Sequence, residues 1–131
     1  MPHIVIEYSA NLESDVAPQR LVDALHETAL KTGVFPLGGL RTRAERRDVY
    51  RIADGNPDNA FVAVLARIGK GRADETRAAV AQALMRTLEA ETAVAFAKRG
   101  LGLTVEVQEI EGPSLKTNNL HERLKAKEET K

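Results

Sequence analysis

The second residue of the chain is a proline, Pro2, which directly follows Met1. Methionine is normally trimmed when the next residue is small, and proline permits the trimming. Pro2 would then carry a secondary amine, which can accept a proton as no internal proline can, with an ordinary α-amino pKa near ~8. Many proteins begin with Met-Pro, and most of these prolines have no chemical role. A general base at the amino terminus is one interpretation of this start, and an inert residue is the other.

Three arginines could hold an anionic substrate against such a base. Arg41 and Arg43 are two residues apart, so on a strand their side chains would share one face. Arg72 follows Gly69-Lys70-Gly71 at the expected start of a helix, where glycines let a ligand approach the backbone and free N–H groups favour anions. A guanidinium adds a bidentate fork for a carboxylate. Each arginine alone is equally consistent with an ordinary surface charge, and neither the Walker nor the dinucleotide-binding glycine spacing is present.

Composition limits the classes of function. The chain has 131 residues, 43% hydrophobic and 29% charged, which suits one compact domain. Lys+Arg and Asp+Glu are both 19, so no global field attracts nucleic acid or an anionic membrane. The lack of cysteine excludes disulfide scaffolds and cysteine zinc sites, and it fits a reducing cytoplasm. No signal peptide and no membrane-length apolar run is evident, and the three histidines have no metal-ligand spacing.

Apolar periodicity predicts an α/β (α+β) fold with the element order β-α-β-β-α-β. We expect a first βαβ unit over residues 1–55, a second over 56–112 and a tail over 113–131, all in one domain 1–131. The expected elements are strands at 3–8, 40–53, 60–68 and 103–110, helices at 18–32 and 73–98, an irregular tail from 113 and a frayed end at 125–131. Right-handed crossovers would place both helices on one face of a four-stranded sheet. Another subunit is the natural cover for the other face.

Five sequence blocks, in order along the chain, point to one family. They are MPHIVIEYS at the start, GVFPLGGLRTR at 33–43, IADGNPDNAFV at 52–62, RIGKGRADETR at 67–77 and TNNLH at 117–121. With these blocks the chain resembles the tautomerase superfamily, and within it most closely the 5-carboxymethyl-2-hydroxymuconate delta-isomerase family. The segment 44–51 departs from the family pattern, because it offers Arg46, Arg47 and Tyr50 where more aromatic character is expected near a pocket. This departure leaves the base alone but bears on the exact substrate.

The resemblance implies a homotrimer whose three sheets enclose a central barrel, with Pro2 as the general base. It implies that Arg41 and Arg72 grip substrate carboxylates, with Arg43 a weaker third that could serve the interface instead. Pockets would lie near subunit junctions, where an arginine from a neighbouring chain can complete the site. The expected reaction moves a proton and a double bond in an unsaturated hydroxy or keto polycarboxylic acid of aromatic catabolism. No metal or organic cofactor is required, and no nucleic acid or membrane partner is expected.

Two alternatives stay open from the sequence. The same amine could serve another tautomerase or a hydratase that acts on a smaller enol acid. The chain could also be a trimeric binding protein without useful activity.

Among other residues, we expect Phe35 and Leu37 to anchor the core and Asn118 to cap a turn or make a tail contact. We expect substitution of Arg67 to leave turnover nearly unchanged.

Overall fold

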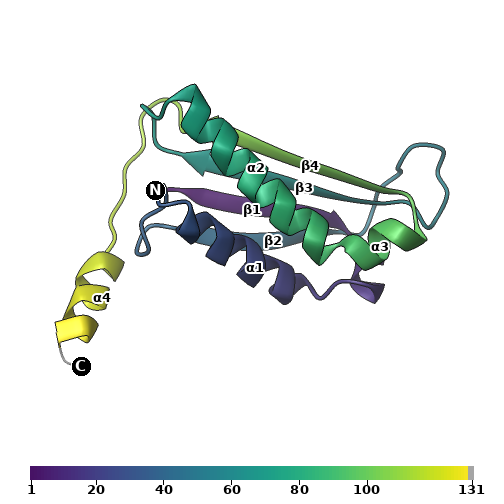
Figure 1. The fold of residues 1–131 in the computed structure, drawn as a ribbon, viewed down its shortest axis with the longest axis horizontal. Coiled ribbons are helices and arrows are strands. Elements are labelled where there is room, and N and C mark those ends of the chain that lie inside the picture. The colour runs from purple at the N-terminus through teal and green to yellow at the C-terminus, as the bar shows by residue number, and fades with distance from the viewer. Residues whose placement is uncertain (130–131) are drawn as a thin grey trace.

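A four-stranded mixed sheet forms the back of the molecule in the computed structural model, which describes residues 1–129 (Figure 1). Its strands are β1 (His3–Ser9), β2 (Arg41–Arg47), β3 (Ala60–Ile68) and β4 (Leu101–Glu109), in the spatial order β2-β1-β3-β4. β1 is parallel to β2 and antiparallel to β3, and β3 is parallel to β4. The helices α1 (Pro18–Lys31) and α2 (Asp74–Glu91) lie side by side on one face of this sheet. The expected β-α-β-β-α-β order and the one-sided helix layer are confirmed.

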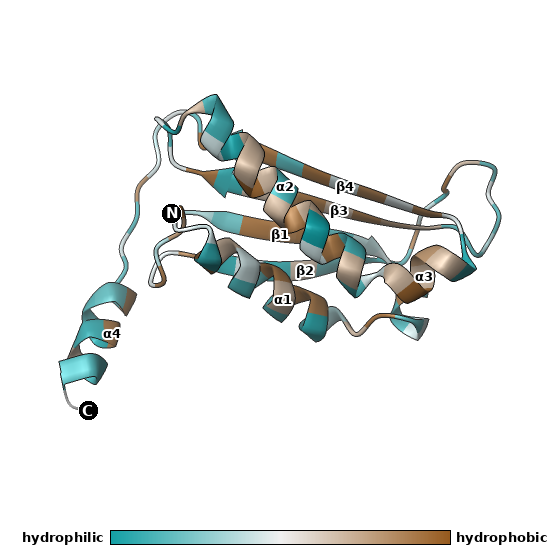
Figure 2. Ribbon diagram, in the orientation of Figure 1, coloured by the Kyte–Doolittle hydropathy of each residue, from teal (hydrophilic) through white to brown (hydrophobic). Residues whose placement is uncertain are grey.

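Strand alternation decides which side chains enter the core between the sheet and the helices. Every second residue of β1 and β3 points toward the helix layer and is buried there against apolar residues of α1 and α2. Figure 2 shows the hydrophobic residues along β1 and β3 behind these two helices. The largest fully buried core side chains are Ile4, Ile6, Leu12, Leu21, Leu25, Val62, Val64, Ile68, Val80, Leu84 and Leu88. The other sheet face carries Val5, Ala63 and Leu65, which are only partly buried. One face of the sheet is thus left without a covering layer in the subunit.

The helix expected at 73–98 is two helices, α2 and α3 (Ala93–Lys98), with a break at Thr92. Thr92 is fully buried, and its hydroxyl donates a hydrogen bond of 2.7 Å to the carbonyl of Leu88, which also accepts from the Thr92 N–H at 3.1 Å. A threonine that bonds back in this way tends to bend a helix. The φ and ψ of Thr92, −111° and 12°, lie outside the helical region. The prediction of one continuous helix was therefore wrong at this residue.

Three other expectations need correction. The strand expected at 40–53 ends at Arg47, because its partner strand β1 ends at Ser9, which pairs with Arg47. The tail expected to be irregular and frayed holds a helix, α4 (Leu120–Glu129), which begins where the side-chain oxygen of Asn118 accepts the Leu120 N–H at 2.7 Å. Residues 130–131 of the expected frayed end lie outside the described residues. Phe35 is buried as expected, but Leu37 is 59% exposed.

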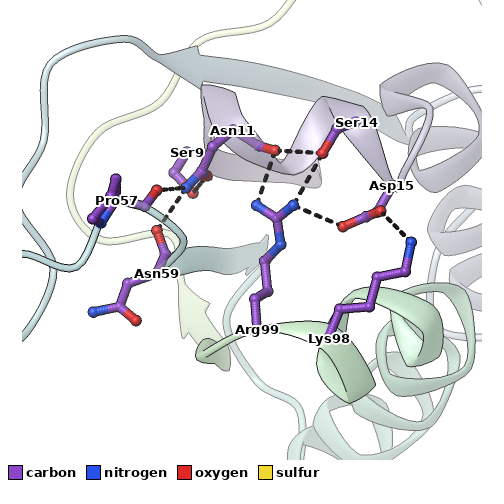
Figure 3. A network of polar contacts seen from close by, with 8 residues as sticks. All are labelled: Ser9, Asn11, Ser14, Asp15, Pro57, Asn59, Lys98 and Arg99. Carbon is purple, nitrogen blue, oxygen red and sulfur yellow. Dashed lines mark hydrogen bonds and ion pairs between the residues drawn. The ribbon is translucent and has the colours of Figure 1, made fainter.

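A polar network closes the end of the sheet where β1 finishes (Figure 3). Asp15 follows the short 3₁₀ helix η1 (Ala10–Ser14), and its nearly buried carboxylate lies 3.2 Å from Lys98 Nζ and 3.0 Å from Arg99 Nη2. The second of these contacts is an ion pair without hydrogen-bond alignment. Arg99 also donates to the carbonyl of Asn11 at 3.1 Å and to the hydroxyl of Ser14 at 3.0 Å. The break at Thr92 is followed directly by α3, which ends at Lys98 and is followed by Arg99.

Arg99→Ala should lower the free energy of unfolding by about 2–3 kcal/mol, because it leaves a nearly buried carboxylate and a partly buried carbonyl short of a partner. Urea titration at fixed subunit concentration measures this change. Arg20→Ala is the matched control, since Arg20 forms a 3.0 Å ion pair with Glu91 but its side chain is 77% exposed. The control should change stability by less than about 0.5 kcal/mol. Equal effects of the two substitutions would show that the network does not stabilise the fold.

Candidate active site

The amino terminus lies where β1 and β2 begin and β3 ends. In the sheet register His3 lies between Arg41 of β2 and Arg67 of β3. The Arg41 N–H donates to the carbonyl of Pro2 at 3.3 Å, which extends the pairing of β1 and β2 to the proline. The geometry of the strands therefore brings Pro2 and Arg41 together, and Arg67 joins them.

The larger of two cavities at this end is cationic. It has a volume of about 400 Å³, and the side chains on its strand side include His3, Arg41 and Arg67. The chain from Pro113 to Thr117 also lines it. Neither Arg41 nor Arg67 forms an ion pair with a carboxylate of residues 1–129, in contrast to Arg47, which pairs with Glu7 at 2.6 Å. Two unpaired guanidinium groups on one cavity wall favour an anionic occupant.

The smaller cavity, of about 230 Å³, contains Pro2 itself. Its other lining residues are Met1, Pro36, Gly39, Lys116, Asn118 and His121. A Cβ at Gly39 would come within 3.1 Å of Pro36 Cγ and 3.5 Å of Pro2 Cδ. The glycine therefore lets the turn after α1 approach the Pro2 ring closely, and it holds the ring against the wall of the cavity.

Met1 lies over both the Pro2 nitrogen and the Arg41 side chain. Met1 lines both cavities, and its sulfur accepts a hydrogen bond from Arg41 Nη1, which also donates to the carbonyl of Gly39 at 3.3 Å. Removal of Met1 would expose the nitrogen of Pro2 and release a donor of Arg41 in the same step.

Arg43 and His3 show the electrostatic character of this end. Arg43 lies on the same sheet face as Arg41, because Thr42 between them points to the helix layer and its hydroxyl bonds His26 at 2.8 Å. Arg43 Nη1 is 3.2 Å from Nδ1 of His3. Burial lowers the pKa of His3 below its ordinary value, and the charges of Arg43, Arg41, the amino terminus and Arg67 lower it further. Protonation of a base is thus disfavoured next to Pro2.

Arg72 is not brought to Pro2 within the subunit. Its Nη2 donates to the carbonyl of Val34 at 3.1 Å, across the gap between the end of α1 and the start of α2. Neither cavity at the amino terminus includes Arg72 among its described lining residues. The structure therefore separates the two arginines that the sequence analysis grouped as the main substrate ligands.

Three residues of this site were not proposed from the sequence. Arg67 was expected to be near neutral, yet the antiparallel pairing of β3 with β1 places it beside His3 in the cationic cavity. Lys116 and His121 come from the tail, which a hydrogen bond of 2.9 Å from the Asn118 amide to the carbonyl of Gly38 holds in place. The expected tail contact of Asn118 is confirmed, and the TNNLH block was the signal that could have pointed to the residues around it.

The atypical segment 44–51 lies apart from these cavities. Arg46 is paired with Glu13 at 2.9 Å and Asp48 at 3.1 Å, and Arg47 is paired with Glu7 and Glu45. Within the described chain, no residue of 44–51 lines either cavity at the amino terminus. In the subunit this segment therefore does not shape the surroundings of Pro2.

Arg43→Met should raise the pKa of His3 part of the way toward its ordinary value, because one of the charges that disfavour the imidazolium is removed. The Cε1–H chemical shift of His3, followed by NMR as a function of pH, measures this. His26 serves as an internal reference, since it bonds Thr42 and not an arginine. A lower or unchanged pKa of His3 in Arg43→Met would contradict the described electrostatics.

Comparison with known proteins agrees with the fold. The sequence profile of the 5-carboxymethyl-2-hydroxymuconate isomerase family matches residues 2–124. The 5-carboxymethyl-2-hydroxymuconate Delta-isomerase of Escherichia coli is 34% identical over 127 residues, which are 95% of this chain and 100% of that protein. The crystal structure of a 5-carboxymethyl-2-hydroxymuconate isomerase from Deinococcus radiodurans R1 has a TM-score of 0.87 at 36% identity and covers 94% of this chain and 93% of its own.

A more distant structure supports the fold alone. A fused 4-OT, described as a wild-type symmetric trimer, has a TM-score of 0.60 at 18% identity and covers 88% of this chain and 94% of its own.

In residues 1–129 no helix has the length and hydropathy needed to cross a bilayer, and no cluster of three or more metal-ligating side chains occurs. The profile match and the relatives that cover almost the whole chain confirm the family expected from the sequence blocks: the chain belongs to the 5-carboxymethyl-2-hydroxymuconate isomerase family.

Proposed function

We propose that this isomerase moves a proton and a double bond within an unsaturated hydroxy or keto polycarboxylic acid of the 5-carboxymethyl-2-hydroxymuconate class, in aromatic catabolism in the cytoplasm. Pro2, freed of Met1, is the general base. The observation that carries this proposal is the position of Pro2 next to β1, where it lines a cavity that shares Met1 and Lys116 with the cavity of Arg41 and Arg67. An acid can thus place a carbon next to the amine while its carboxylate lies among the arginines.

In the first step the Pro2 nitrogen takes a proton from a carbon, or from a hydroxyl, at one end of the conjugated system. The electrons left behind form a dienolate, whose charge spreads toward a carbonyl or carboxylate oxygen. Arg41 lies where that charge develops, and stabilisation there is worth several kcal/mol in favourable sites. The prolinium then returns the proton to another carbon of the system, which shifts the double bond and restores the amine. The balance is one proton out and one proton in, so no cofactor is needed.

The base acts only when it is neutral. The cations that lower the pKa of His3 lie next to Pro2 as well, so the same field opposes a positive charge on the proline nitrogen. We propose that the pKa of the free Pro2 amine falls below the ordinary α-amino value for this reason. Activity should then rise with pH through that pKa and level off once the amine is neutral.

The arginines have separate roles in this proposal. Arg41 binds the carboxylate or enolate oxygen nearest the base, since the loss of Met1 frees its Nη1. Arg43 is the weaker contributor, because it lies on the same sheet face but is not among the cavity residues. Arg72 acts in the site of a neighbouring subunit, since its own Pro2 cavities do not include it.

The uncovered sheet face supports a homotrimer. Val5, Ala63 and Leu65 form an apolar centre on this face, with Glu7, Glu45 and Glu106 around it. Partly buried apolar side chains on an uncovered face gain free energy when another layer covers them. We propose that three copies of the sheet cover one another, in keeping with the symmetric trimer of the fused 4-OT.

Pro2→Ala, which is still trimmed, leaves a primary amine and should reduce turnover without abolishing it. A variant with one extra residue before Pro2 converts the nitrogen to an amide, which has no basic lone pair. It should lose roughly 10²–10⁴-fold in kcat/KM, the range of general-base catalysis. Intact mass confirms each terminus, and ultraviolet absorbance follows the conjugated substrate. Full turnover by the extended variant would exclude the amine as the base.

Arg41→Ala and Arg72→Ala should each weaken turnover of a polycarboxylate substrate by roughly 10²-fold, the scale of one charge-assisted contact. Arg86→Ala is the control, because Arg86 lies on the exposed side of α2. Arg67, which lines the cationic cavity, is not a suitable control. Equal and small effects of all three substitutions would contradict the assignment.

Mixed trimers then test where Arg72 acts. Subunits with a blocked Pro2 and an intact Arg72 are refolded together with Arg72→Ala subunits that have a free Pro2. If Arg72 reaches a neighbour's site, the mixture should be more active than the two parents measured separately. Activity equal to the sum of the parents would place the action of Arg72 within its own subunit.

Sedimentation equilibrium at micromolar concentration should give about three times the 14.3 kDa mass of the chain. Leu65→Asp places a charge in the apolar centre of the uncovered face and should dissociate the trimer. Val94→Asp is the matched control, since Val94 of α3 is 60% exposed on the other side of the molecule. A wild-type chain that sediments as a fully active monomer would refute the trimer.

A further inference from the structure

The two cavities at the amino terminus share two lining residues, Met1 and Lys116. Met1 is the residue whose removal exposes the base. Once it is gone, Lys116 is the residue that lies against both the space around Pro2 and the space around Arg41 and Arg67. A molecule that extends from the base into the cationic cavity therefore passes Lys116.

The tail that carries Lys116 makes two contacts with Gly38, one with its carbonyl and one with its α-carbon. The Asn118 amide donates to the carbonyl of Gly38 at 2.9 Å, while the oxygen of the same side chain caps the first N–H of α4. The His121 ring lies over the α-carbon of Gly38, where an added Cβ would come within 2.5 Å of Nδ1. An added Cβ at Gly38 would therefore displace the His121 ring from this position, and the contacts of the tail with Gly38 set where Lys116 lies.

The charges around Lys116 favour an anion with more than one carboxylate. Arg41 and Arg67 line the larger cavity from the strands, and Lys116 lines the same cavity from the tail. The one acidic residue of that cavity, Glu111, is paired with Lys70 at 3.0 Å. Within residues 1–129 the Lys116 ammonium has neither an ion pair nor a hydrogen-bond acceptor, so its charge is available to a ligand.

We propose that Lys116 binds a second carboxylate of the substrate, remote from the one held by Arg41, and that it selects polycarboxylic acids over monocarboxylic ones. This inference rests on the proposed function, because it concerns the substrate of the same site. It assigns the choice of substrate to the carboxy-terminal tail, whereas the strands supply the base and the first carboxylate ligand.

Binding of an unreactive acid tests this without turnover. Adipate and its monomethyl ester have the same carbon chain but two carboxylates and one, and calorimetry measures their affinities for the trimmed protein. Lys116→Ala should weaken adipate about five- to tenfold and the monoester less than twofold. Lys116→Arg should restore most of the preference. Lys125→Ala is the control, because Lys125 is an exposed lysine of the same tail that lines neither cavity.

Gly38→Ala supplies a second variant in which Lys116 is intact but its tail is displaced. It should lose the preference for adipate as Lys116→Ala does, whereas Gly69→Ala should keep it, since an added Cβ at Gly69 meets nothing within 4 Å. Equal losses for both acids in Lys116→Ala, no loss for either, or a wild type that binds both acids equally would overturn the inference. Full turnover by the variant with an extra residue before Pro2, together with an intact adipate preference in the trimmed protein, would refute the proposed base and leave Lys116 as a carboxylate ligand.

Discussion

The pairing of β1 on both of its edges is the constraint on which the site depends. β2 and β3 hold β1 from His3 onward, and Ile4 and Ile6 are fully buried under the helices. Chain termini are ordinarily mobile, and a base that moves loses its orientation toward a substrate. Here the residue next to the terminus is the first residue of an interior strand, so the nitrogen of Pro2 is held still. The same two pairings bring Arg41 and Arg67 to either side of His3, which couples the position of the base to that of the anion-binding groups.

The two ends of the sheet use charge in opposite ways. At the far end, Asp15 is enclosed by Lys98 and Arg99, and the cations of the β2 terminus are paired with glutamates. At the amino-terminal end, Arg41 and Arg67 have no carboxylate partner among residues 1–129. Paired charges stabilise the contacts between loops and helices. Cations without a carboxylate partner repel one another and favour the binding of an anion. The repulsion between the two arginines destabilises the folded state, and the well-packed core offsets this destabilisation. A bound anion would reduce the repulsion.

The sequence predicted the strands and helices correctly where a pattern of apolar residues extends over many positions. Runs of β-branched and apolar residues predicted the bounds of β1 and β3 closely, and the five sequence blocks indicated the family. The break at Thr92 did not follow, because it depends on one buried hydroxyl in a run of good helix formers. Arg67 and the tail residues did not follow either. Their place at the site depends on antiparallel strand pairing and on a hydrogen bond between residues 80 positions apart, and neither leaves a local pattern.

The central claim is that the nitrogen of Pro2 is the base, and its titration tests this most directly. Protein labelled with ¹⁵N-proline, with its trimmed terminus verified by mass, gives the pKa of the Pro2 amine from the ¹⁵N chemical shift. If Pro2 is the base, this pKa lies below the ordinary α-amino value and coincides with the pKa of the ascending limb of kcat/KM against pH. A terminal amine that titrates at the ordinary value while the kinetic limb lies elsewhere would contradict the claim.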